Sequence, residues 1–218
     1  MRLFSYKMTH DSGFAPNPFF GAMTLATCKP KIRECKKIGD WIAGFTSGQM
    51  CGDNVGEEKL VYLMKVTRKM SMASYYSSQE FNSKIPDLSQ ETFIYRSGDN
   101  IYKPLVGLPV KVNDFIQLKN PNHWDFVNDR ENMFNKTKDL RGKYVLVSNE
   151  YYYFGRRALT IPPDIKPDVP KGQSGHGQET KNSDKVSKFI NYIKNNYEVG
   201  IHGAPHKWPS NDTSWQLL

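Results

Sequence analysis

Apolar positions along the chain fall into short runs that polar turns, glycines and prolines separate. Runs of this length, rich in branched and aromatic side chains, are typical of strands. The strongest covers residues 60–66, where Val61, Leu63 and Val66 stand between charged segments. The same pattern predicts strands at 2–8, 22–28, 40–45, 101–102, 114–118, 143–147 and 151–160, and a further short strand around 93–95.

Helical spacing is clear in one segment, 183–197, where Val186, Phe189, Ile190 and Ile193 recur on one face. Shorter helices are expected at 30–37 and 71–81, and residues 129–138 fit either a short helix or a loop. Many short strands with few helices predict an α+β protein. We expect a small curved mixed β-sheet or a small β-barrel, with peripheral helices and one C-terminal helix.

The domain organisation follows from a change in composition near Pro163. Residues 1–163 form the β-rich domain. Residues 164–181 are rich in Pro, Gly and Lys and predict a flexible loop. Residues 182–218 supply the C-terminal helix and a tail that packs on the same domain.

Cysteine and histidine spacing argues against disulfides and metals. The three cysteines include no Cys-x-x-Cys pair, so reduced thiols and a cytoplasmic protein are expected. His202 and His206 have metal-ligand spacing, but Gly203 and Pro205 interrupt a shared helical face. We therefore predict no metal and no cofactor. No apolar run is long enough for a membrane span, so no membrane partner is expected either.

The net charge of +8 and an aromatic content of 13% suit an anionic, flat ligand such as a nucleotide or DNA. Equally, lysines often form solvated faces and aromatic rings usually fill cores. If the chain binds a nucleotide, the stiff loop 14–21, the segment 24–33 and the aromatic run 151–157 are the places for it. The candidate binding residues are Asn17, Phe19, Thr24, Thr27, Lys29, Arg33, Trp41, Asn100, Tyr153, Phe154, Arg156 and Arg157.

Candidates for catalysis are fewer, and no pair of them has diagnostic spacing. Cys28 is the leading thiol because its basic neighbour Lys29 favours the reactive thiolate, although a single cysteine is commonly a small buried apolar residue. Acids and bases that could act with it are His10, Asp40, Asp99 and His123. Whether the protein is an enzyme stays open at this point.

Several separated motifs occur together in one order: Phe14–Phe19, Thr24–Pro30, Gly39–Gly44, Gly98–Tyr102 and Tyr152–Gly155. In the presence and order of these motifs, residues Arg2 to Pro163 resemble the second nucleotide modification associated domain family. The resemblance implies a setting in bacterial or phage base-modification systems rather than a particular reaction. The segments 39–42 and 60–66 are more weakly similar to the EVE and PUA-like base-binding domains, which implies a small barrel with an aromatic pocket.

Together these observations predict a protein that binds a nucleotide or modified base in a DNA-modification or counter-defence pathway. A base- or nucleotide-modifying enzyme is the first alternative. A protein-interaction module with exposed aromatic side chains is the second, and the sequence predicts no oligomeric state.

Overall fold

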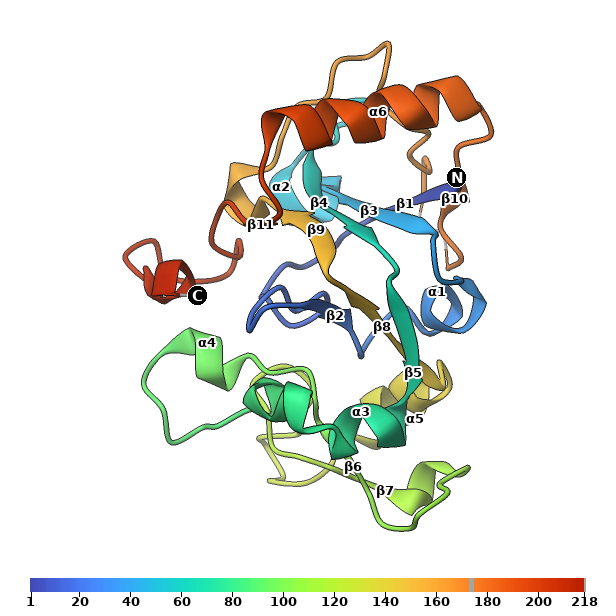
Figure 1. Cartoon of the computed structure of the whole chain (residues 1–218). Helices are drawn as coiled ribbons and strands as arrows, with labels where there is room; N and C mark the ends of the chain where they lie inside the picture. Colours follow the sequence, from blue (N-terminus) through green and yellow to red (C-terminus); the bar gives the residue numbers. More distant parts are fainter. Residues whose placement is uncertain (173–174, 218) are drawn as a thin grey trace.

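The computed structural model describes residues 1–172 and 175–217, and a six-stranded mixed sheet forms its centre (Figure 1). The strand order is β10-β1-β3-β4-β9-β11. β1 pairs with β3 in parallel, and β3, β4 and β9 follow as antiparallel neighbours. The strands are β1 (Leu3–Lys7), β3 (Trp41–Phe45), β4 (Leu60–Lys65), β9 (Glu150–Tyr153), β10 (Gln178–Glu179) and β11 (Gly200–Ile201).

Two smaller sheets extend the fold toward the candidate site. One has the order β2-β8-β5, and the other is the antiparallel pair β6-β7. These strands are β2 (Met23–Leu25), β5 (Arg68–Ser71), β6 (Tyr102–Pro104), β7 (Phe115–Gln117) and β8 (Tyr144–Ser148). β8 and β9 are consecutive, so one connection at Asn149 joins the central sheet to the β2-β8-β5 sheet.

The helices lie at the periphery, and α6 crosses one face of the central sheet (Figure 1). Its apolar residues Val186, Phe189, Ile190 and Ile193 are buried together with Trp41 and Leu63 of the sheet. The α-helices are α1 (Pro30–Cys35), α2 (Gly48–Cys51), α3 (Met72–Ser77), α4 (Phe93–Arg96), α5 (Met133–Leu140) and α6 (Ser183–Asn196). Short 3₁₀ turns cover Gln79–Lys84, Val112–Asp114, Gly155–Arg157 and Ser214–Leu217.

The α+β class and most of the expected strands are confirmed. Over the described residues the sheets form no closed barrel, so the chain adopts an open mixed sheet rather than a small barrel. Residues 93–95 are helical rather than extended, as part of α4. The strand expected at 151–160 ends at Tyr153, because Gly155 takes a positive φ against the carbonyl of Ala204 and starts a 3₁₀ turn.

The segment 164–181 is only partly the loop that its composition predicts. Residues 178–179 form β10, which pairs with Phe4 and Ser5 of β1. Residues 173–174 lie outside the described part of the chain. In the ranges 1–172 and 175–217, no helix has the length and apolar character that a membrane span requires.

Candidate functional site

The turn after β2 presents Cys28 in an unusual backbone conformation. Cys28 and Lys29 have φ values of 53° and 37°, a region that residues with side chains rarely occupy. Helix α1 begins directly afterwards, with Pro30 in its first turn. Two successive left-handed residues before a helix bend the chain sharply, and such outliers cluster at functional sites. Cys28 itself is partly exposed.

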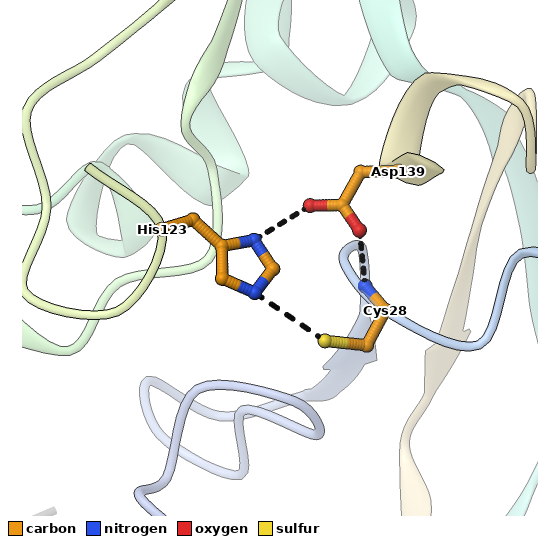
Figure 2. Close-up of side chains that lie close together, drawn as sticks. All are labelled: Cys28, His123 and Asp139. Carbon is orange, nitrogen blue, oxygen red and sulfur yellow. Dashed lines mark hydrogen bonds and ion pairs between the residues drawn. The ribbon is translucent and has the colours of Figure 1, made fainter. Parts of the chain in front are cut away.

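His123 and Asp139 meet Cys28 from two distant parts of the chain (Figure 2). The imidazole lies between them: Nε2 is 3.5 Å from Cys28 Sγ, and Nδ1 is 2.8 Å from Asp139 Oδ2. The other carboxylate oxygen of Asp139 accepts a hydrogen bond of 2.7 Å from the Cys28 backbone N–H. A thiol, an imidazole and an orienting carboxylate in this order are the parts of an activated nucleophile.

The loop that carries His123 is fixed by its own polar residues. Asn120 has no exposed surface, and its Oδ1 accepts from the backbone N–H groups of Asn122 and His123. Gln117 of β7 donates to the carbonyl of His123 at 3.0 Å. An Asn side chain that bonds the backbone two or three residues later stabilises such a turn. The imidazole is therefore held from its backbone as well as through Asp139.

Asp139 stands near the end of α5 and is fully buried. Its Oδ2 also accepts from the Tyr102 hydroxyl at 2.7 Å. Buried Arg33 ties the same region together: its Nε donates to the carbonyl of Cys28, and its two terminal nitrogens donate to the carbonyls of Tyr144 and Asp139. A guanidinium with several fixed donors suits this bridging role between main-chain segments.

The electrostatics favour a charged imidazole. Burial lowers the pKa of His123, but hydrogen bonds to Asp139 and Cys28 and the charges of both raise it, with a net result of about 9. At neutral pH both ring nitrogens therefore carry protons, and each can donate to its neighbour. An imidazolium 3.5 Å from Sγ is the counter-ion that a thiolate nucleophile requires.

A cavity of about 310 Å³ opens onto Cys28 and His123. This volume lies at the small end of the range for ligand pockets. The lining contains basic, hydroxyl and apolar side chains. Phe14 packs edge-on against His123, with the two ring centroids 4.9 Å apart. The lining residues are Tyr6, Met8, Thr9, His10, Ser12, Phe14, Ala15, Cys28, Lys29, Asn122, His123 and Lys207.

The same three side chains are also the set best placed to hold a metal ion, because their ligand atoms lie within 4.8 Å of one another. The hydrogen bonds favour the other use. Both nitrogens of His123 are engaged, one with each partner, so the ring separates Cys28 from Oδ2 of Asp139. Binding one ion to all three residues would require breaking the bond between His123 and Asp139.

A second cysteine–histidine–aspartate set lies outside the cavity lining. Cys51 Sγ is 3.5 Å from His206 Nε2, and His206 Nδ1 is 3.3 Å from Asp11 Oδ2. Asp11 is buried and also accepts from the Tyr153 hydroxyl at 2.5 Å. Burial and the nearby charge of Asp53 raise the pKa of Cys51, which favours the neutral thiol. This second set provides an internal comparison for Cys28.

Of the five catalytic candidates from the sequence, the structure brings three to this cavity: Cys28, His123 and His10. Asp40 lies elsewhere and pairs with Arg2 at 2.8 Å. Asp99 is buried beneath the loop 14–21 and accepts from Thr24 and Tyr75. The carboxylate beside the histidine is Asp139, which the sequence analysis did not select.

Among the candidate binding residues, only Lys29 lines the cavity. Most of the others are buried in contacts within the protein. Asn17, Phe19, Thr24, Thr27, Arg33, Trp41, Asn100, Tyr153 and Phe154 are buried. Arg156 donates to the carbonyls of Pro205 and Trp208, and Arg157 to that of His202. The aromatic and basic run 151–157 thus anchors the C-terminal segment.

The comparison with known families decides the relationship. The family model for nucleotide modification associated domain 2 matches residues 1–212 of the chain. The chain belongs to this family. The family match confirms the resemblance seen in the sequence and extends it beyond Pro163, through α6 and His206. It includes all three members of the Cys28 site. No curated protein and no solved structure matches the chain.

Proposed function

We propose that this member of the nucleotide modification associated domain 2 family is a cysteine-dependent acyltransferase. In this proposal Cys28 carries an acyl group as a thioester and delivers it to an amino group of a nucleotide or nucleobase. The observation that carries the proposal is the hydrogen-bonded set of Cys28, His123 and Asp139, of which Cys28 and His123 line a cavity. The family places the protein in nucleotide modification, and the site supplies a chemistry for it.

In the first step the Cys28 thiolate attacks the carbonyl carbon of an activated acyl donor, an ester or thioester. His123 donates its Nε2 proton to the leaving group, which departs as an alcohol or thiol. Asn122 lines the cavity beside His123, and its Oδ1 accepts from Ser12 at 2.8 Å. Its amide N–H groups are the donors that we assign to the developing oxyanion.

In the second step neutral His123 takes a proton from the attacking amine as its nitrogen bonds to the thioester carbonyl. The sulfur leaves as a thiolate, and the ion pair with His123 is restored. Asp139 takes part in no bond change. It holds the Nδ1–H of His123, so that Nε2 faces the sulfur in both steps.

Lys29, Lys207 and His10 surround the same cavity with basic groups, while Tyr6, Met8 and Phe14 supply apolar contacts. This mixture suits a nucleotide or modified base, and we place the reaction in a cytoplasmic DNA-modification or counter-defence pathway of a bacterium or phage. A pocket that binds such a base without turnover would need the cavity but not the ordered thiol–imidazole pair.

The test begins with thiol reactivity in the full chain. Iodoacetamide labelling, followed by peptide mass mapping, measures the rates at Cys28, Cys35 and Cys51 separately. We expect Cys28 to react at least about tenfold faster than Cys51 at pH 6–7. Cys28 faces an imidazolium over this range, whereas burial and the charge of Asp53 raise the pKa of Cys51 and favour its neutral thiol. Equal rates at the two sites, or a Cys28 rate unchanged in His123→Ala, would contradict the proposal.

Acyl transfer is then measured directly. The chain is incubated with acetyl and longer acyl thioesters, and mass spectrometry detects a hydroxylamine-sensitive adduct on Cys28. The acceptors are dAMP, dCMP and dGMP, which carry exocyclic amines, and TMP, which does not. Cys28→Ala is the inactive variant and Cys51→Ala the matched control. A metal that co-purifies with wild type but not with Cys28→Ala would favour metal binding over acyl transfer.

A further inference from the structure

We propose that Lys29, Lys207 and His10 form a phosphate subsite that binds the phosphate of a nucleotide substrate in the Cys28 cavity. All three side chains line this cavity. The inference rests on the proposed function for the choice of substrate, since it names which part of the substrate the basic groups hold. It also makes a claim about binding that stands or falls without any turnover.

The cavity lining contains basic side chains but no carboxylate. Three of its twelve lining residues are Lys or His besides His123, and none is Asp or Glu. Among the ion pairs of the described residues, neither Lys29 nor Lys207 appears. Gathering unpaired cations costs free energy in the empty protein, and a bound anion offsets it.

Lys29 is partly withdrawn from water. Its Nζ lies 4.4 Å above the ring of Tyr6, and burial lowers its pKa. It directly follows Cys28 in the chain, shares its left-handed backbone conformation, and lines the same cavity. A lysine held in this way is set for a ligand that also reaches the sulfur.

Lys207 and His10 meet from the two ends of the chain. The backbone N–H of Lys207 donates to the carbonyl of Asp11 at 3.0 Å, which fixes Lys207 beside the loop that carries His10. Burial and the charge of Lys207 both lower the pKa of His10, which favours the neutral imidazole. The neutral ring still carries one N–H that can donate to a phosphate oxygen.

The carboxylate of Asp11 could have neutralised Lys207, but its hydrogen bonds go to other groups. It is buried and accepts from the Tyr153 hydroxyl and from both the backbone and the ring of His206. The one acidic side chain in this loop is therefore turned away from the cavity, and the positive charge at the rim is left for a ligand.

The size of the cavity limits the substrate. About 310 Å³ admits a small ligand such as one mononucleotide, with its phosphate at the rim and its base toward Cys28. Phosphate held away from the reacting atom is a binding contact that can position the base for attack. A phosphate-bearing acyl donor has the same chemistry, so the experiment must separate the two sources.

The experiment measures equilibrium binding by calorimetry to the full-length Cys28→Ala variant, which cannot react, and to wild type. The probes are dAMP, dCMP and dGMP, the corresponding nucleosides, inorganic phosphate and coenzyme A. The variants are Lys207→Ala and Lys29→Ala. Lys188→Ala is the control, because it removes the same charge from the solvent-facing side of α6, outside the cavity lining.

We expect a monophosphate to bind at least about tenfold more tightly than its nucleoside, the usual size of a charge-assisted contact. Lys207→Ala should remove most of this difference and Lys188→Ala should keep it. Inorganic phosphate should compete. If coenzyme A binds in the same lysine-dependent way and the nucleotides do not, the subsite stands and the donor carries the phosphate.

The proposal is overturned if nucleoside and nucleotide bind equally, if Lys207→Ala behaves like Lys188→Ala, or if no phosphate compound binds. None of these binding results would contradict the expected labelling rate of Cys28, which is measured separately. Conversely, an unreactive Cys28 with intact, lysine-dependent nucleotide binding would remove the acyl-transfer chemistry and leave the subsite in place. The two proposals can therefore fail separately.

Discussion

Asp139 fixes the ring of His123 through a hydrogen bond of 2.8 Å, and the carboxylate that makes this bond has no exposed surface. The bond determines which nitrogen faces Cys28. The same carboxylate also accepts a hydrogen bond from the backbone N–H of Cys28. This second bond fixes the position of the nucleophile relative to the base. One buried side chain thus positions both partners of the proposed reaction.

Asp139→Asn tests this positioning role. The amide of the new Asn side chain can donate an N–H to Nδ1 of His123. This bond favours the tautomer of His123 that carries no proton on Nδ1. We expect the rate of Cys28 alkylation and of thioester formation to fall by at least about 100-fold. The pH dependence of labelling should also move, because the charge that raises the pKa of His123 is gone.

The control for this variant is Asp40→Asn, which removes another buried carboxylate, one paired with Arg2. It should destabilise the chain without changing the labelling rate of Cys28 in the folded state. A similar loss of Cys28 reactivity in both variants would mean that Asp139 acts only through stability.

The sequence predicted Cys28 and His123 as separate candidates, but it could not pair them. They are 95 positions apart, and their contact depends on how the loop after β7 folds over the turn after β2. No feature of the sequence indicated a functional role for Asp139, because an acidic residue directly after the polar segment 129–138 is typical of a solvated helix. Only the buried position of its side chain at the end of α5 distinguishes it.

The secondary structure was easier to predict from the sequence than the site, because the local pattern of apolar and polar residues largely determines local structure. The apolar run at 60–66 and the helical spacing at 183–197 predicted β4 and α6 correctly. Most of the predicted binding residues are buried in contacts within the protein, because aromatic and basic side chains serve packing as well as ligand binding. Arg33 and Trp41 illustrate this: one bridges backbone carbonyls and the other lies in the core.

The raised pKa of His123 predicts a pH-dependent stability. Its value of about 9 in the folded chain exceeds the ordinary 6.5, so the folded state binds the proton more tightly. The resulting stabilisation is complete below about pH 6.5 and is lost as the pH rises through about 9. The pKa difference corresponds to about 3 kcal/mol at most.

Urea unfolding of wild type and His123→Gln between pH 6 and pH 10 measures this contribution. Glutamine keeps an N–H donor but does not titrate, so the difference between the two proteins isolates the imidazole. The advantage of wild type should shrink steadily above pH 6.5. A constant difference across the range would show that folding does not raise the pKa of His123.

Arg33 predicts a link between stability and the geometry of Cys28. Arg33→Met removes the donors of three buried carbonyl bonds, including the one to Cys28. We expect a loss of about 3 kcal/mol, which lowers Tm by about 6–12 °C, together with slower labelling of Cys28.

Gly142→Ala approaches Arg33 from the other side, because a Cβ there would lie 2.6 Å from the guanidinium. It should reproduce both effects of Arg33→Met while leaving the arginine present. Gly107→Ala is the control, since a Cβ at that position meets nothing within 4 Å. Normal Cys28 labelling in folded Gly142→Ala would separate the guanidinium from the site.

A buried cation under the loop 14–21 gives the last prediction. Lys84 is almost completely buried, and its Nζ donates to the carbonyls of Asn17 and Phe19 and to the Asn17 side chain. Burial lowers its pKa to about 8, and the charge of nearby Asp99 partly opposes this shift. Asp99 is itself buried, with a raised pKa that the charge of Lys84 keeps from rising further.

Lys84→Met should therefore cost about 3 kcal/mol or more at pH 7, since three acceptors lose their donor and the Asp99 carboxylate loses its cation. The added substitution Asp99→Asn should recover part of that loss, because it removes the buried charge that Lys84 no longer balances. Thermal unfolding of the wild type, both single variants and the double variant closes the cycle. If the loss in the double variant equals the sum of the two single losses, the two side chains stabilise the loop independently. A loss in the double variant that exceeds this sum would contradict the charge argument.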